Sequence, residues 1–217
     1  MSIQRQAHCP VCRGSQFRYF MAVADRDYWR CEHCMATWLD PDQRPGPVHE
    51  KAEYDQHRNE VADPGYRAFL ARLADVLIPR LAGGARGLDF GCGPGPALVA
   101  MLGEAGFQVE GYDPFYAPDE RLLESRYDFI TCTEVVEHLH HPAAVFDQLD
   151  DLLRPGGWLG IMTCFQTDDE RFAGWHYRRD PTHVVFYREE TLRRVGEQRG
   201  WRCEIPRKDV ALFHKVG

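Results

Sequence analysis

The chain has 217 residues, of which 44% are hydrophobic and 27% are charged, and its formal net charge at pH 7 is −7. This composition is typical of a globular protein with one substantial domain and a small accessory module. The negative balance disfavours a broad nucleic-acid-binding surface, and no apolar stretch is long enough to span a membrane. Because the N-terminus has no charged and apolar leader, we expect a cytoplasmic protein.

The first predicted module comprises residues 1–40 and contains two C-x-x-C pairs, in HCPVC and RCEHC. This spacing is typical of a zinc ribbon, in which four thiolates, here Cys9, Cys12, Cys31 and Cys34, close tetrahedrally on Zn²⁺. The aromatic-rich segment between the pairs predicts two short strands. Four sulfur ligands leave no open coordination position, so we expect a structural ion that stabilises a small fold.

A polar, proline-rich stretch follows, and we predict a linker over residues 41–62. The second predicted domain comprises residues 63–217. It begins with a helix, because Tyr66, Leu70, Leu73 and further apolar residues recur at three- and four-residue spacing.

The segment LDFGCGPGPALVAML predicts a strand, a glycine-rich loop and a helix. Its three glycines, from Gly91 onward, let the backbone turn sharply and approach a ligand closely. A dinucleotide-binding loop would have a further glycine where this chain has Pro96, and here Asp89 precedes the first glycine by two positions. A second predicted strand, QVEGYDP, ends at Asp113, where a carboxylate suits the hydroxyls of a ribose.

Together with YDFITCTEVVEHL and LLRPGGWLGIMT, these segments resemble the motifs of class I S-adenosylmethionine-dependent methyltransferases, over roughly residues 50–217. The resemblance implies a Rossmann-like α/β domain, an open sheet with helices on both faces, that binds S-adenosylmethionine. It also implies which residues hold the cofactor: Asp89, Gly91, Cys92, Gly93, Gly95, Asp113, Pro114 and Glu134. Asp89 and the glycines would hold the methionine part, and Asp113 the ribose.

The connection after Asp113 departs from this family. Only thirteen residues, PFYAPDERLLESR, precede the next predicted strand at Tyr127. They cannot contain a helix of about 11 residues and a strand of about 5. We therefore expect a shortened crossover after the second strand, with the third strand lost or vestigial. Phe115 or Tyr116 would then stack on adenine, or else pack against the crossover.

The segment EVVEHL follows the strand that begins at Tyr127. On helical spacing, Glu134, Glu137 and His138 lie on one face. The segment resembles one in ubiquinone-pathway O-methyltransferases and in small-RNA 3′-terminal 2′-O-methyltransferases, where these residues bind a divalent metal. The resemblance implies a second metal site, for Mg²⁺ or a similar ion, formed by Glu134, Glu137, His138 and His183.

An alternative without a metal stays open. In it, Glu134 lines the cofactor, while Glu137 and His138 make structural hydrogen bonds or His138 acts as a general base. His140 and His141 precede a helix predicted to start at a proline, and we expect them to be exposed.

A long connection, CFQTDDERFAGWHYRRDPTHVVFY, follows the fifth predicted strand and precedes a helix at REETLRRVGEQRG. Long connections at the carboxyl ends of strands are commonly functional lids. The aromatic residues of this connection are equally suited to covering the edge of the sheet. His183 and His176 are the first candidates for a base that removes a proton from an acceptor, followed by Glu134 and Glu137.

These features predict an S-adenosylmethionine-dependent methyltransferase that O-methylates a small or carrier-borne metabolite. Two alternatives stay open. One is metal-dependent 2′-O-methylation of RNA guided by the ribbon, which the net charge disfavours. The other is a non-catalytic, cofactor-binding adaptor whose ribbon recruits a partner.

Overall fold

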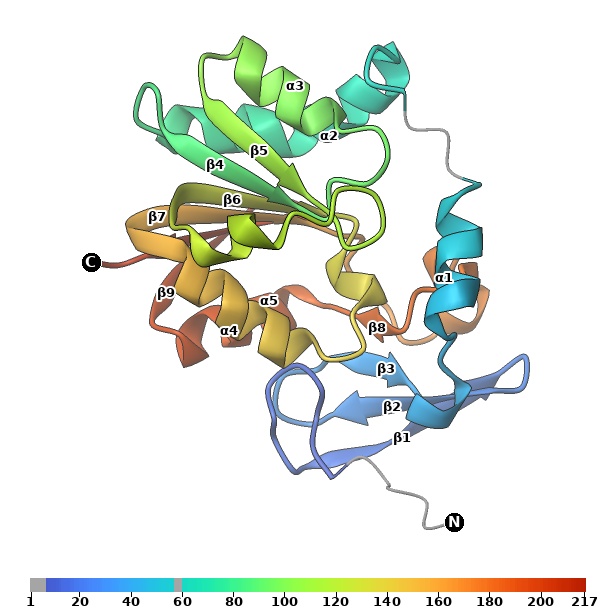
Figure 1. The fold of residues 1–217 in the computed structure, drawn as a ribbon. Helices are drawn as coiled ribbons and strands as arrows, with labels where there is room; N and C mark the ends of the chain where they lie inside the picture. Colours follow the sequence, from blue (N-terminus) through green and yellow to red (C-terminus); the bar gives the residue numbers. More distant parts are fainter. Residues whose placement is uncertain (1–6, 57–59) are drawn as a thin grey trace.

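The computed structural model describes residues 7–56 and 60–217. Residues 1–6 of the predicted ribbon and residues 57–59 of the predicted linker lie outside the described residues. The chain forms a large sheet covered by helices on both faces and a smaller sheet beside it (Figure 1).

The elements of regular structure follow in chain order. The strands are β1 Phe17–Val23, β2 Arg26–Cys31, β3 Thr37–Leu39, β4 Arg86–Phe90, β5 Gln108–Tyr112, β6 Tyr127–Thr133, β7 Leu153–Met162, β8 Val185–Phe186, β9 Trp201–Arg207 and β10 Val210–Lys215. The α-helices are α1 Pro47–Tyr54, α2 Pro64–Leu77, α3 Ala97–Glu104, α4 Pro142–Leu152 and α5 Glu189–Gln198. Short 3-10 helices are η1 Pro41–Gln43, η2 Ile78–Arg80, η3 Glu120–Glu124, η4 Val136–His138, η5 Phe172–Gly174 and η6 Tyr177–Arg179.

The large sheet has the strand order β5-β4-β6-β7-β10-β9. Strands β4 to β7 are parallel, whereas β10 runs antiparallel to its neighbours β7 and β9. As predicted, the fold is α/β and Rossmann-like, with a short crossover: η3 occupies the connection between β5 and β6, and β5 forms the edge of the sheet. Because β5, β4 and β6 are neighbours and run parallel, their carboxyl ends lie next to one another.

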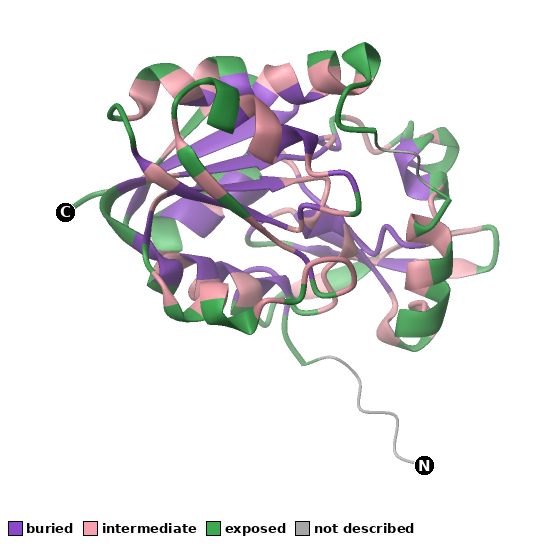
Figure 2. Ribbon diagram, turned by 45° about the horizontal axis from the view of Figure 1, so that its top comes forward, coloured by how far each residue is buried: buried purple, intermediate pink, exposed green. Residues whose placement is uncertain are grey.

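Helices α2 and α3 cover one face of this sheet, and α4 and α5 cover the other (Figure 1). The apolar stripe predicted for α2 is confirmed, since Leu70, Leu73 and Leu77 are buried. Asp63 caps this helix by accepting a hydrogen bond from the amide of Tyr66. Because both faces of the sheet are covered, its inner strands are almost continuously apolar and buried (Figure 2).

The smaller sheet contains three strands from the predicted ribbon and one from the second predicted domain. Its order is β1-β2-β3-β8, and β8 comes from the long connection after β7. Thr37 pairs with Phe186 and Trp38 with Val185. The ribbon therefore shares one hydrophobic core with the face covered by α4 and α5.

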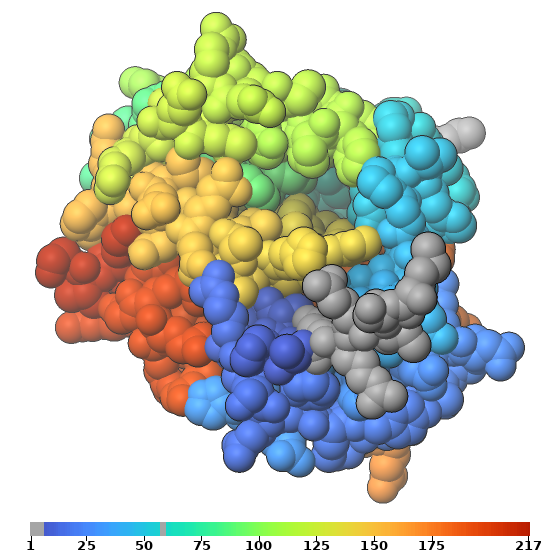
Figure 3. Space-filling model, turned by 60° about the horizontal axis from the view of Figure 1, so that its bottom comes forward, coloured from blue at the N-terminus to red at the C-terminus, as the bar shows by residue number. Residues whose placement is uncertain are grey.

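The segment expected to be a linker contains helix α1, which begins with Pro47 at its first turn. Figure 3 shows α1 (cyan) and the ribbon (blue) on one face of the molecule, beside the yellow segment that follows β6. Among the described residues, no helix combines the length and apolar character needed to cross a bilayer.

Candidate functional site

The four cysteines predicted to bind zinc come together in the ribbon and are buried. The sulfur of Cys9 lies 3.7 Å from that of Cys34, and the sulfur of Cys12 lies 3.6 Å from that of Cys31. Sulfurs placed tetrahedrally about 2.3 Å from Zn²⁺ would be separated by about 3.8 Å. The spacing of these thiols thus fits a structural zinc ion.

The two cysteine pairs lie in turns of similar shape. Arg13 and Met35, which follow the second cysteine of each pair, have φ angles of 59° and 62°. The amides of His33 and Cys34 point at the sulfur of Cys31 over 3.4 Å. Amide donors directed at a sulfur stabilise its thiolate form, the form that binds metal.

The glycine-rich loop turns between β4 and α3 through left-handed backbone conformations. Gly91 has a φ of 81° and Gly93 a φ of 64°. A Cβ on Gly91 would come within 2.3 Å of the Val135 side chain, whereas one on Gly93 would meet open space. Gly91 is therefore required both by its conformation and by the close approach of the segment after β6.

Asp113 is held at the end of β5 by backbone amides. Its carboxylate accepts hydrogen bonds from the amides of Gly93, at 3.1 Å, of Phe115, at 2.8 Å, and of Tyr116, at 3.1 Å. These bonds tie the glycine-rich loop to the short crossover and orient the carboxylate at the cavity described below.

Asp89 lies on β4 and is 4% exposed. It accepts a hydrogen bond of 2.7 Å from the hydroxyl of Thr131 on the neighbouring strand. Burial raises the pKa of Asp89 to about 6, and the nearby charge of Asp113 acts in the same direction.

A cavity of about 680 Å³ opens at the carboxyl ends of β4, β5 and β6. This is where open α/β sheets bind ligands, and the volume lies within the usual range for small-molecule sites. Among the predicted cofactor residues, those that line the cavity are Gly91, Cys92, Gly93, Asp113, Pro114 and Glu134. Asp89 and Gly95 are not part of its lining.

Several carboxylates and histidines line the cavity. Its lining contains the carboxylates of Glu50, Asp113, Glu134 and Asp180, together with His138, His140 and His183. Within the described part of the chain, the lining includes no lysine or arginine. The cavity therefore favours ligands that are cationic or neutral over anionic ones.

Three of the four residues predicted for a second metal site come together beside the cavity. One ligand atom each of Glu137, His138 and His183 lies within 4.8 Å of the others. The rings of His138 and His183 are 4.6 Å apart. Glu134 is not a member of this cluster.

The two histidines of the cluster are oriented by backbone carbonyls. His138 Nδ1 lies 3.1 Å from the carbonyl oxygen of Thr182, and His183 Nδ1 lies 2.7 Å from that of Tyr177. Since a carbonyl only accepts hydrogen bonds, each Nδ1 carries a proton, and in the neutral imidazole each Nε2 then carries the lone pair that a metal needs. Metal-binding histidines are commonly oriented by such bonds.

Glu137 is fully buried. The hydroxyl of Thr163 donates to its carboxylate over 3.0 Å, and the hydroxyl of Tyr177 also donates to it. Burial, and next the charge of Glu134, raise the pKa of Glu137 well above its usual range. A buried carboxylate beside two oriented imidazoles fits a divalent cation, which would balance its charge.

Glu134 lies at the end of β6 and not on a helix with Glu137 and His138, so the predicted shared helical face is wrong. Its φ is 51° and its amide donates to the carbonyl oxygen of Met162 over 2.8 Å, which continues the strand pairing. The 3-10 helix η4 begins only at Val136. Burial raises the pKa of Glu134 to about 7.

The remaining histidines lie apart from the cluster. His176 is exposed and is not part of the cavity lining. His141 is exposed as expected, but His140 is half-buried, lines the cavity and lies 2.9 Å from Glu50. The prediction that His140 is exposed is therefore wrong, because α1 packs over it.

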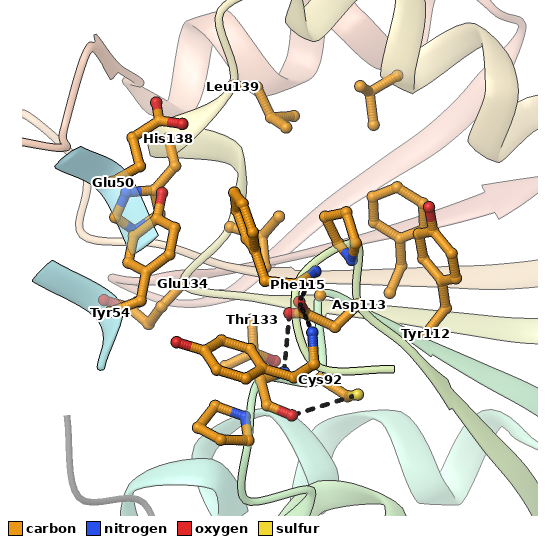
Figure 4. A pocket seen from close by; sticks show the side chains of 18 of the residues that line it. Glu50, Tyr54, Cys92, Tyr112, Asp113, Phe115, Thr133, Glu134, His138 and Leu139 are labelled. Carbon is orange, nitrogen blue, oxygen red and sulfur yellow. Dashed lines mark hydrogen bonds between the residues drawn. The ribbon is translucent and has the colours of Figure 1, made fainter. Parts of the chain in front are cut away.

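Helix α1 contributes two residues to the cavity lining that no sequence pattern indicated. Glu50 and Tyr54 line the cavity, and the ring of Tyr54 packs against His138 at 5.1 Å and Phe115 at 5.8 Å (Figure 4). Pro47 after a glycine was the one signal that a helix could start in this segment.

Comparisons with known proteins agree with the fold. A family model described as "Methyltransferase domain" matches residues 35–204. The chain is similar to "Ubiquinone biosynthesis O-methyltransferase" of Burkholderia ambifaria, with 29% identity over 150 residues that cover 58% of this chain and 57% of that protein. The corresponding protein of Shewanella halifaxensis is 27% identical over 168 residues, which cover 65% and 63%. The matches thus span less than two thirds of these relatives.

Solved structures show the same fold. A "SAM dependent methyltransferase" from Archaeoglobus fulgidus has a TM-score of 0.51 and 23% identity, covering 72% of this chain and 75% of that one. "Magnesium protoporphyrin IX methyltransferase" from Synechocystis, with bound S-adenosylhomocysteine, has a TM-score of 0.50 and 16% identity, covering 70% and 84%.

Proposed function

Because the chain belongs to the methyltransferase-domain family of class I S-adenosylmethionine-dependent enzymes, we propose that it O-methylates a small or carrier-borne hydroxyl acceptor. In this proposal, Glu137, His138 and His183 would hold a divalent cation that polarises the acceptor hydroxyl. The observation that carries this proposal is the position of the cluster: His138 and His183 line the same cavity as the glycine-rich loop and Asp113.

The cofactor side of the cavity is formed by the loop at Gly91 and by Asp113. When bound, S-adenosylmethionine supplies a methyl group on a sulfonium, and a divalent cation lowers the pKa of a coordinated hydroxyl. The loop would bring backbone amides close to the cofactor, and Asp113 would accept hydrogen bonds from ribose hydroxyls. On the short crossover, Phe115 and Tyr116 line the same side and are suited to packing on the adenine ring.

On the acceptor side, we assign Glu134 as the group that takes the hydroxyl proton. Its carboxylate lines the cavity, whereas His183 faces the proposed cation and His176 lies outside the cavity. Positioning the acceptor oxygen against the methyl group supplies much of the rate enhancement in such a reaction, and proton removal adds to it.

The chemistry of the lining supports a neutral or cationic acceptor. Carboxylates without lysine or arginine among the described lining residues disfavour phosphate groups, and so they disfavour RNA as the acceptor. The relatives named for ubiquinone biosynthesis support a hydroxyl acceptor. The mixed nitrogen and oxygen ligands suit a divalent transition metal such as Mn²⁺ better than Mg²⁺, which prefers oxygen ligands.

We also propose that Cys9, Cys12, Cys31 and Cys34 bind one structural Zn²⁺. The role of the ribbon is then internal, because its strand β3 pairs with β8. The ribbon also contacts α4 and α5, since Ala143 donates its amide to the carbonyl oxygen of Pro10 and Gln198 donates to that of Cys12.

The proposal is tested by calorimetric titration of the protein with S-adenosylmethionine, with and without Mn²⁺, followed by methyl-transfer assays on hydroxyl acceptors. We expect one cofactor per chain, and transfer that EDTA abolishes. If no cofactor binds, the enzyme proposal is wrong. If EDTA-treated protein transfers the methyl group at an unchanged rate, the proposed role of the cation is wrong.

A further inference from the structure

The hydroxyl of Tyr177 contacts two carboxylates, those of Glu134 and Glu137. It donates to Glu137 and lies 3.2 Å from a carboxylate oxygen of Glu134. It also lies 3.0 Å from the hydroxyl of Thr163, which itself donates to Glu137. Tyr177 is only 8% exposed, so these contacts are made in a buried environment.

Tyr177 also contacts the cation cluster through its backbone and its ring. Its carbonyl oxygen lies 2.7 Å from Nδ1 of His183, and its ring packs against the imidazole at 4.1 Å between centroids. One residue therefore orients both a carboxylate ligand and an imidazole ligand of the proposed cation.

The two carboxylates are in different positions relative to the cavity. Glu134 lines the cavity and is not a member of the ligand cluster. Glu137 is a member of the cluster, has no exposed surface and is not part of the cavity lining. The hydroxyl of Tyr177 lies between them.

We infer that Tyr177 is a positioning residue: the hydroxyl proton that it donates to Glu137 keeps this carboxylate directed at the cation, while Glu134 lies on the acceptor side of the same hydroxyl oxygen. The inference rests on the proposed function, because it takes the cluster as a cation site. It also assigns Glu134 to the acceptor and not to the cation, which separates two residues that the sequence pattern grouped together.

The experiment measures Mn²⁺ affinity by electron paramagnetic resonance, with the protein saturated with S-adenosylhomocysteine. We expect Tyr177→Phe to weaken Mn²⁺ binding by about 10- to 100-fold, the usual effect of losing an outer-shell partner. Glu134→Gln should leave the Mn²⁺ affinity near that of the wild type and lower only the rate of methyl transfer.

Tyr127→Phe is the matched control. Tyr127 is also buried, but its hydroxyl donates to the backbone carbonyl of Leu122, at 2.8 Å, away from the carboxylates. Its Mn²⁺ affinity should equal that of the wild type. Binding of S-adenosylhomocysteine verifies the fold of each variant, and if Tyr177→Phe fails this check, Thr163→Val removes the other hydroxyl on Glu137 and should weaken Mn²⁺ binding in the same direction.

The outcomes separate the two proposals. If the wild-type protein binds S-adenosylhomocysteine but no Mn²⁺, the proposal of a cation site is wrong, and the inference about Tyr177 is wrong as well. If the wild type binds Mn²⁺ and Tyr177→Phe binds it equally well, the cation site stands and only the inference about Tyr177 is wrong. Weaker Mn²⁺ binding by Glu134→Gln, as large as that by Tyr177→Phe, would make Glu134 a ligand and also contradict the inference.

Discussion

Val184 donates its backbone amide to the carbonyl oxygen of Glu137 at 2.9 Å, and its own carbonyl oxygen accepts from the amide of Leu39, also at 2.9 Å. Leu39 ends strand β3 of the ribbon, and Glu137 belongs to the proposed cation cluster. Val184 also directly follows His183. A single peptide segment thus connects the four-cysteine ribbon with the proposed cation cluster.

Removal of zinc should therefore increase backbone hydrogen exchange outside the ribbon as well as within it. Zinc is displaced with a thiol-reactive mercurial and captured with EDTA. We then expect faster hydrogen exchange in β8 and around Glu137, because β3 pairs with β8. The measurement is hydrogen–deuterium exchange followed by mass spectrometry, with zinc content determined in parallel. Faster exchange confined to residues 7–40 would show that the ribbon does not support the site.

The two left-handed glycines of the cofactor loop should differ in their tolerance of alanine. Both substitutions place a Cβ in a left-handed conformation, which costs about 1–2 kcal/mol. Gly91→Ala adds a clash with Val135, whereas Gly93→Ala does not. We expect Gly91→Ala to lower the melting temperature more and to abolish cofactor binding. Equal melting temperatures for the two variants would contradict the close contact with Val135.

Asp89 should make stability depend on pH. Its pKa is raised from 3.8 to about 6, so the folded protein holds this proton more tightly than the unfolded chain does. The stability that protonated Asp89 contributes is fully present below pH 3.8 and is lost as the pH rises to about 6. The loss is on the order of 3 kcal/mol, at about 1.4 kcal/mol per pKa unit.

Asp89→Asn mimics the protonated state and isolates this contribution. Melting temperatures of variant and wild type should be similar below pH 3.8, and the variant should become progressively more stable than the wild type as the pH rises to 6. The same variant should bind S-adenosylhomocysteine more weakly if the carboxylate serves the cofactor's ammonium group. A stability difference that stays constant between pH 4.5 and pH 7.5 would show that Asp89 does not titrate in this range.

Replacing the acceptor-side carboxylate should impair the reaction. Glu134→Gln is isosteric and removes the proton acceptor, so we expect the turnover rate to fall by about 100-fold or more. His176→Ala, which changes an exposed residue outside the cavity, should leave turnover unchanged. Steady-state methyl-transfer kinetics compare the two. A large loss in His176→Ala with little loss in Glu134→Gln would exchange their assignments.

The sequence predicted the elements that depend on neighbouring residues. The loop at Gly91, the strand that precedes Asp113 and helix α2 follow from local patterns of apolar residues and glycines. The short crossover also followed, because a count of residues limits what can fold there. The grouping of His183 with Glu137 and His138 was predicted from the resemblance to known methyltransferases, and no local sequence pattern indicated it.

Contacts between distant segments were not predictable in this way. The pairing of β3 with β8 joins backbone groups of Trp38 and Val185, and hydrogen bonds of the backbone leave little trace in residue type. Tyr54 and Tyr177 each reach the site from segments without regular apolar spacing. Their roles depend on how those segments pack across the cavity, which only the folded structure defines.

The proposed cation site is tested most directly by anomalous diffraction from crystals grown with Mn²⁺ and S-adenosylhomocysteine. The expected result is an anomalous peak within bonding distance of the Glu137 carboxylate and of Nε2 of His138 and His183, beside S-adenosylhomocysteine in the cavity. S-adenosylhomocysteine bound in the cavity, with no anomalous peak among these three side chains, would contradict the account.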